Sequence, residues 1–265
     1  MSGFDKNWLE LREPADRAAR SGSLLLAVSD HFASLPPPHR IIDIGCGTGS
    51  TYRMLSPVLP GAEWKLLDYE QTLLNEAERQ IGASDNVECH CQDLNTLDET
   101  LFDGAALVTA SALFDLCSAD FCDRFVDLLA RRKIGLYAAL NYDGIMDWSV
   151  DHPLDGQVVA DFNRHQQSDK GFGPALGPDA SDHLAVLCQA KGFTVETDTS
   201  PWRLGPETAR LQNEFLLGIR RPIEEMGNIS SSDFERWLDF RLSHISVEGS
   251  VCTVGHTDFL ALPRI

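Results

Sequence analysis

Three glycines at alternate positions follow a short apolar stretch near residue 41 of this 265-residue chain. The segment reads Ile41-Ile-Asp-Ile-Gly-Cys-Gly-Thr-Gly-Ser50, which predicts a strand that turns sharply into a helix. Glycine suits such a turn because its backbone bends freely and because it has no Cβ to hold a ligand away from the amide groups. The segment therefore predicts a ligand that lies against the backbone.

An aspartate follows each of the next two predicted strands. Asp68 ends the strand predicted from Trp64, where a Rossmann-like sheet places the carboxylate that accepts hydrogen bonds from two ribose hydroxyls. Asp93 follows the strand predicted over Val87 to Cys91. Either aspartate alone is also typical of a helix cap or a solvated strand end. Together with the glycine turn, and in this order, they favour a binding site.

The GxGxG spacing, with Asp43 two residues before the first glycine, resembles the class I S-adenosylmethionine (SAM)-dependent methyltransferases. Dinucleotide-binding folds carry GxGxxG instead, which disfavours an NAD(P)-dependent oxidoreductase. The resemblance covers the motifs of residues 40–140 and, as architecture, the last two predicted strands. It implies SAM as the methyl donor and S-adenosylhomocysteine (SAH) as the product.

The same resemblance assigns cofactor contacts residue by residue. The three glycines and Asp43 would hold the methionine part of SAM, Asp68 the ribose, and Asp93 the adenine. Tyr69 would cover the other side of the ring. The full set of predicted cofactor residues is Asp43, Gly45, Gly47, Gly49, Asp68, Tyr69, Asp93, Leu94 and Ser111.

The N-terminal segment predicts a helical cover for this site. Phe4, Trp8 and Leu11 recur at helical spacing, and Pro14 can open a second helix. One of two arginines, Arg12 or Arg17, would pair with the carboxylate of the cofactor. The alternative is a solvated ladder at i,i+4 spacing, formed by Arg12, Asp16 and Arg20.

Methyl transfer from a sulfonium is an in-line displacement, so aligning the acceptor provides much of the catalysis. A base is needed only where the acceptor must lose a proton. We predict Asp115, after the fourth strand, and His165, beside a loop rich in glycine and proline, as catalytic candidates.

Acceptor contacts are predicted after the fifth strand, which is expected to end at Leu140. The candidates there are Asn141, Tyr142 and Asp143. The Asn/Asp-Pro-Pro-Tyr/Phe motif of methyltransferases that act on DNA or on a release-factor glutamine is absent, which disfavours those acceptors.

Alternating strand and helix patterns predict an α/β fold. We expect a doubly wound, mostly parallel, seven-stranded Rossmann-like sheet. Residues 1–39 would form an N-terminal helical cover, 40–200 and 246–265 the SAM-binding domain, and 201–245 a helical insertion that serves as a substrate lid or dimer element. Within the insertion, Ser232 and Glu235 predict a capping box.

The composition of the chain limits the classes of binding partner that we expect. A net charge of -18 would repel a phosphate backbone, and no apolar stretch is long enough for a membrane span, so we expect a small-molecule acceptor, no nucleic acid and no membrane. The N-terminus has no apolar signal core, which favours a cytoplasmic protein. The apolar faces of the inserted helices suit their own domain or a twofold partner equally well, so we expect a monomer or a homodimer. No metal site is predicted. A catalytically silent SAM-binding regulatory or scaffold protein remains the alternative.

Overall fold

The computed structural model describes residues 5–264. Its strands are β1 (Arg40–Ile44), β2 (Glu63–Asp68), β3 (Val87–Cys91), β4 (Ala105–Ser111), β5 (Gly135–Trp148), β6 (Phe193–Thr199), β7 (Trp202–Leu204) and β8 (Cys252–Pro263). Its α-helices are α1 (Lys6–Ala19), α2 (Gly22–Ser34), α3 (Ser50–Leu55), α4 (Gln71–Ile81), α5 (Ala119–Arg132), α6 (Asp155–Gln166), α7 (Ala180–Ala190), α8 (Ala209–Met226) and α9 (Ser231–His244). Short 3-10 turns include η1 (Leu94–Thr96), η3 (Phe114–Leu116) and η5 (Pro206–Thr208).

One sheet organises the described chain, in the order β3-β2-β1-β4-β5-β8-β6, with β7 added beside β8. β1 to β5 pair in parallel, whereas β8 is antiparallel to both β5 and β6. The predicted doubly wound α/β sheet is therefore confirmed, and β7 is a strand that the prediction lacked. Strand order reverses between β1 and β4, which is where such sheets bind ligands.

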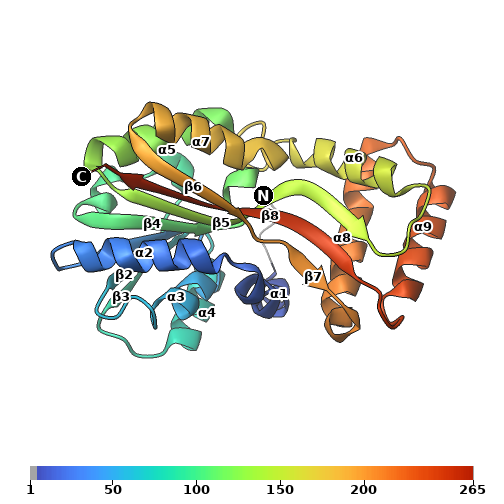
Figure 1. Ribbon diagram of the computed structural model, residues 1–265, viewed down its shortest axis with the longest axis horizontal. Helices are drawn as coiled ribbons and strands as arrows, with labels where there is room; N and C mark the ends of the chain where they lie inside the picture. Colours follow the sequence, from blue (N-terminus) through green and yellow to red (C-terminus); the bar gives the residue numbers. More distant parts are fainter. Residues whose placement is uncertain (1–4, 265) are drawn as a thin grey trace.

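Helices cover both faces of the sheet, as Figure 1 shows. α2, α3 and α4 pack on one face, with Trp64, Leu66 and Leu74 in the buried cluster beneath them. α5 and α7 cover the other face, where Phe125 and Leu184 are buried. Ser118 caps α5 by accepting a hydrogen bond from the Phe121 amide.

The apolar pattern predicts that β5 ends at Leu140, but the strand continues well beyond that residue. Leu140 has a φ of 57° and the pairing with β8 shifts register beside it, so the strand bends and continues to Trp148. Asp258 of β8 fixes this bend, since its carboxylate accepts from the Leu140 amide at 2.8 Å and from the Tyr137 hydroxyl at 3.0 Å.

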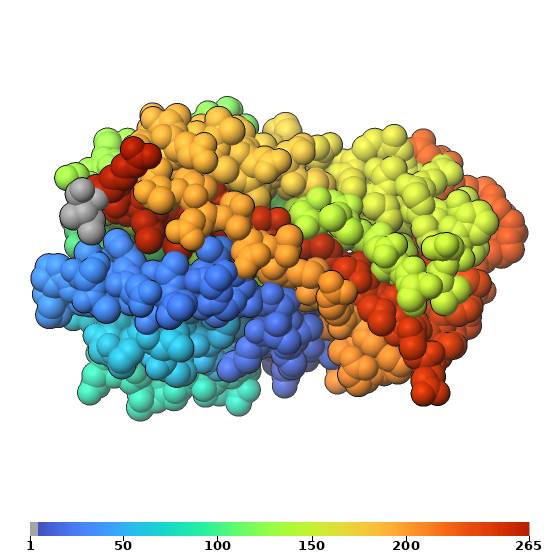
Figure 2. All heavy atoms as spheres, in the orientation of Figure 1, coloured from blue at the N-terminus to red at the C-terminus, as the bar shows by residue number. Residues whose placement is uncertain are grey.

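The extended ends of β5 and β8 carry a second helical group, seen at the right of Figure 1. α6, α8 and α9 enclose a core with β7 that includes Val158, Trp202, Ile219 and Trp237. In Figure 2, dark blue α1 lies between the cyan residues of the first half and the orange residues of the second. No described helix is long and apolar enough to span a membrane.

Two local predictions are wrong. Pro14 does not open a second helix, because α1 runs from Lys6 to Ala19 with Asp5 as its N-cap. The cap of α9 is Ser230, which accepts from the Asp233 amide, rather than Ser232. Glu235 instead pairs with Arg220 of α8.

Candidate active site

A cavity of about 900 Å³ opens where strand order reverses, beside the carboxyl ends of β1, β2 and β4. Small-molecule sites typically measure about 300–1,000 Å³, so this cavity is at the large end of the range. Its walls come from both halves of the chain, since α1 and the glycine turn line one part and α8 lines another.

The glycine turn adopts the backbone that its sequence requires. Gly45, Gly47 and Gly49 all have positive φ, at 59°, 54° and 80°. A Cβ on Gly47 would stand 3.1 Å from a methyl carbon of Leu9, so α1 also packs closely here. Gly45 and Gly47 line the cavity with their backbone, whereas Gly49 caps the start of α3 behind it.

Asp68 combines a structural and a binding position. One carboxylate oxygen accepts from the Gly47 amide at 2.8 Å and the other from the Glu70 amide at 3.0 Å, while the side chain lines the cavity. Burial raises the pKa of Asp68, and these two amide hydrogen bonds oppose that rise. The carboxylate is therefore held rigidly and keeps lone pairs for a ligand.

The structure brings most predicted cofactor residues together on the cavity wall. Those that line it are Gly45, Gly47, Asp68, Tyr69, Asp93, Leu94 and Ser111. Asp93 also caps η1 by accepting from the Asn95 amide at 2.9 Å. The same residue can therefore cap this turn and line the cavity. Tyr69 is 41% exposed, and its hydroxyl donates to Glu70.

Asp43 lies beneath the glycine turn rather than on the cavity wall. It is 1% exposed, and one carboxylate oxygen accepts from the Thr109 hydroxyl at 2.7 Å. Its second oxygen has no hydrogen-bond partner among the described residues. Burial raises the pKa of Asp43 to about 7, against the lowering effects of Thr109 and Arg20.

α1 covers the cavity with a buried ion pair, so the solvated ladder is wrong. Arg12 binds Asp16 through two hydrogen bonds of 2.8 and 3.2 Å, and both residues line the cavity. Trp202 of β7 donates to Asp16 at 2.9 Å and lies under the Arg12 guanidinium. Arg17 does not line the cavity, and its side chain is 53% exposed.

Arg20 was assigned only to the ladder, yet it lies directly behind the wall of the site, in contact with two residues that line the cavity. Its guanidinium donates to the Ser111 hydroxyl at 3.0 Å and to the Thr51 hydroxyl at 3.3 Å, and both of these residues line the cavity. Its Nη1 is buried and has no partner among the described residues. A buried guanidinium with an unused donor is suited to a carboxylate ligand.

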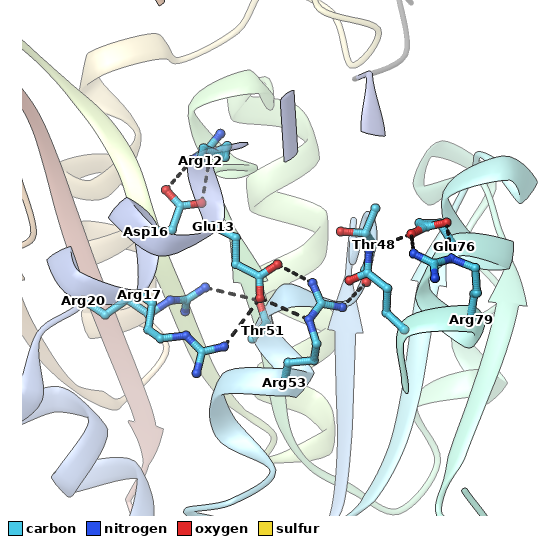
Figure 3. Close-up of polar contacts among 11 residues, drawn as sticks. Arg12, Glu13, Asp16, Arg17, Arg20, Thr48, Thr51, Arg53, Glu76 and Arg79 are labelled. Atoms are coloured by element: carbon cyan, nitrogen blue, oxygen red, sulfur yellow. Dashed lines mark hydrogen bonds and ion pairs between the residues drawn. The ribbon is translucent and has the colours of Figure 1, made fainter. Parts of the chain in front are cut away.

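Arg53 connects α1 to the glycine turn, as Figure 3 shows. Its guanidinium donates to the Glu13 carboxylate on α1, with one contact of 3.1 Å, and to the Thr48 carbonyl at 2.5 Å. The Arg53 and Glu13 side chains are only 18% and 19% exposed. This contact holds α1 against the glycine turn.

Replacing Glu13 by glutamine should loosen that cover and weaken SAM binding about fivefold, since a partly buried ion pair contributes about 1 kcal/mol. Calorimetric titration with SAM measures the change. Glu10→Gln, an exposed change on the same helix, is the matched control and should bind SAM as the unmodified protein does. Equal affinity in both variants would show that the contact does not support the site.

A hydrogen-bonded chain of polar side chains also lines the cavity. The Lys170 ammonium donates to His165 Nδ1 at 3.2 Å, and His165 Nε2 donates to Glu225 at 2.8 Å. Arg221 donates to the same carboxylate at 2.6 Å. All four line the cavity, so the structure places the predicted His165 there with both ring nitrogens engaged.

The remaining candidates lie behind this wall. Asp115 is buried between Leu113 and Leu116, which both line the cavity, and its Oδ1 has no partner among the described residues. Asn141, Tyr142 and Asp143 do not follow β5 but lie within it, because the strand continues past its bend. None of those three lines the cavity.

A family model described as "Methyltransferase domain" matches residues 41–132, from β1 to the end of α5. The chain contains a methyltransferase domain. This match supports the predicted class I SAM-dependent methyltransferase family and agrees with SAM as its cofactor. The matched span holds the glycine turn, both aspartates and Ser111.

Known proteins resemble this methyltransferase over more of its length. A malonyl-[acyl-carrier protein] O-methyltransferase of Bacillus cereus is 23% identical over 188 residues, which are 69% of this chain and 64% of that protein. A cyclopropane-fatty-acyl-phospholipid synthase-like protein from Lactobacillus casei is 15% identical with a TM-score of 0.60, covering 98% and 95% of the two chains. A mycolic acid cyclopropane synthase, solved with SAH, is 15% identical with a TM-score of 0.51, covering 89% and 83%. At these identities the solved structures are evidence of a shared fold.

Proposed function

We propose that this protein transfers a methyl group from SAM to a small-molecule acceptor by in-line displacement. One observation supports this most directly. One cavity is lined both by the glycine turn, Asp68 and Asp93 and by a polar cluster around His165 and Lys170. It therefore offers a place for a cofactor and a second place for an acceptor beside it.

The contacts described above indicate which residues would bind the cofactor. Asp68 would accept from the ribose hydroxyls while its two amide hydrogen bonds hold it in place. Asp93 would accept from the adenine amino group, with Leu94 against the ring. Arg20 would direct its unused Nη1 at the methionine carboxylate, a role that sequence reasoning gave to Arg12 or Arg17. SAM, once bound, supplies an activated methyl group and a good leaving group.

Of the two predicted candidates, Asp115, which lies just behind the cavity wall, is the better candidate for a base. His165 has both ring nitrogens engaged by Lys170 and Glu225, whereas Asp115 keeps a buried oxygen without a partner among the described residues. Burial raises the pKa of Asp115 to about 6, and Arg12 and Lys170 limit the rise. A base works best when its pKa lies near the working pH.

Turnover should therefore rise with pH through about 6 and level off above it, because only the ionised Asp115 accepts a proton. Asp115→Asn should lower kcat about a hundredfold, within the range for loss of a general base, and should remove this pH step. The pH dependence of kcat for both proteins is the measurement. An unchanged pH step in Asp115→Asn would remove Asp115 from the reaction.

Titration of the protein with SAM, SAH and NADH tests the proposed cofactor, and mass spectrometry of a small-molecule acceptor panel then tests transfer. Binding of SAM and SAH with a methylated product supports the enzyme. Binding without any product across the panel would favour the silent regulatory protein. Binding of NADH but not SAM would overturn the proposal.

A further inference from the structure

Lys170 lies in the loop between α6 and α7 and lines the acceptor end of the cavity, remote in the chain from the glycine turn. Its only side-chain hydrogen bond within residues 5–264 is the one to His165 Nδ1. No carboxylate in that part of the chain lies within salt-bridge distance of its ammonium. Burial lowers the pKa of Lys170, and the charge of Arg221 adds to this effect, whereas the charges of Glu225 and Asp115 oppose it.

The carboxylates that share the cavity wall are already bound. Asp16 accepts from Arg12 and Trp202, and Glu225 accepts from Arg221 and His165. Asp169, next to Lys170, accepts from the amides of Gly171 and Gly173 in its own loop. The lysine therefore presents positive charge that these neighbours do not pair with directly.

Apolar surface lies beside this charge. The hydrophobic residues that line the same cavity include Trp8, Leu113, Leu116, Phe172 and Pro222. Gly218 of α8 also lines the cavity, and a Cβ there would meet nothing within 4 Å, so the space in front of this helix is open. The wall suits a ligand that has one charged end and an apolar body.

We propose that the methyl acceptor carries an anionic group, a carboxylate or a phosphate, and that Lys170 binds that group. This inference rests on the proposed function, because it assumes that SAM occupies the other end of the cavity. His165 acts as a positioning residue, since its contact with Glu225 orients the nitrogen to which Lys170 donates. Apolar residues of the cavity wall, such as Phe172 two positions after Lys170, receive the apolar part of the acceptor.

The test is calorimetric titration of the SAH-saturated protein, at low ionic strength, with malonate and separately with inorganic phosphate. Malonamide serves as the neutral counterpart of malonate. We expect at least one anion to bind and malonamide not to bind. Lys170→Met should weaken anion binding about tenfold or more, because a charge-assisted hydrogen bond is lost, and Lys170→Arg should retain most of it.

Lys191→Met is the matched control, since Lys191 pairs with Asp127 on the surface and does not line the cavity. It should bind both anions as the unmodified protein does. A preference for malonate or for phosphate identifies which anionic group the site takes. Equal anion binding by Lys170→Met, or binding of malonamide as tight as malonate, would overturn the inference. Failure to bind SAH at all would instead overturn the proposed function.

Discussion

Asp68→Ala should weaken SAM binding by about a hundredfold or more. Each hydrogen bond from a ribose hydroxyl to a carboxylate contributes about 1.5–3 kcal/mol, and the variant loses two of them. It also removes the acceptor of the Gly47 amide, at 2.8 Å, so the glycine turn loses a contact that fixes its shape. Both effects weaken the binding of SAM.

Calorimetric titration with SAM and with SAH measures this loss, and thermal unfolding without ligand shows whether the variant still folds. Asp85→Ala removes an exposed aspartate from a nearby loop and is the matched control. If Asp68→Ala folds and binds SAM within threefold of the unmodified protein, Asp68 is not the ribose ligand.

Arg20→Met is expected to weaken SAM binding by about ten- to a hundredfold, because a buried guanidinium would lose its carboxylate partner. The methionine side chain keeps much of the apolar stem. Arg17→Met removes an arginine of the same helix whose side chain is 53% exposed, so it should leave the affinity unchanged. The two variants separate a specific contact from a general loss of positive charge on α1.

A second ligand shows whether Arg20 binds the carboxylate of SAM directly or only supports the site. Methylthioadenosine has the adenosine and sulfur of SAM but no amino acid carboxylate, so Arg20→Met should bind it as tightly as the unmodified protein does. A similar loss for SAM and methylthioadenosine would mean that Arg20 supports the site only by holding Ser111 and Thr51 in place.

The sequence was most informative where function depends on neighbours in the chain. A strand end, the turn after it and the next helix start are adjacent in sequence, so the glycines, Asp68 and Asp93 could be placed without knowledge of packing. The parallel sheet followed from the same alternation of strands and helices.

It was least informative where position depends on how distant segments pack. Arg12 and Arg17 lie in α1 and Arg20 is its C-cap residue, and their spacing alone does not say which of them contacts the site. That choice is made by Trp202 and Ser111, which are far away in the chain. Lys170 gave no signal because its neighbours on the wall belong to α6 and α8.

The length of β5 was missed for a related reason. Its apolar run ends near Leu140, and a polar Asn141 follows, which is typical of a strand end. Asp258 accepts from the Leu140 amide and so stabilises a bend that no local pattern marks. The error carried over to Asn141, Tyr142 and Asp143, whose predicted position depended on the strand ending there.

The place of β8 in the sheet affects how this protein can be synthesised. β8 covers residues 252–263, yet it pairs with both β5 and β6. A ribosome that has reached only residue 250 has therefore released two strands whose shared neighbour does not yet exist. Unpaired strand edges template association with other chains, so nascent or prematurely terminated molecules should aggregate far more readily than the finished protein.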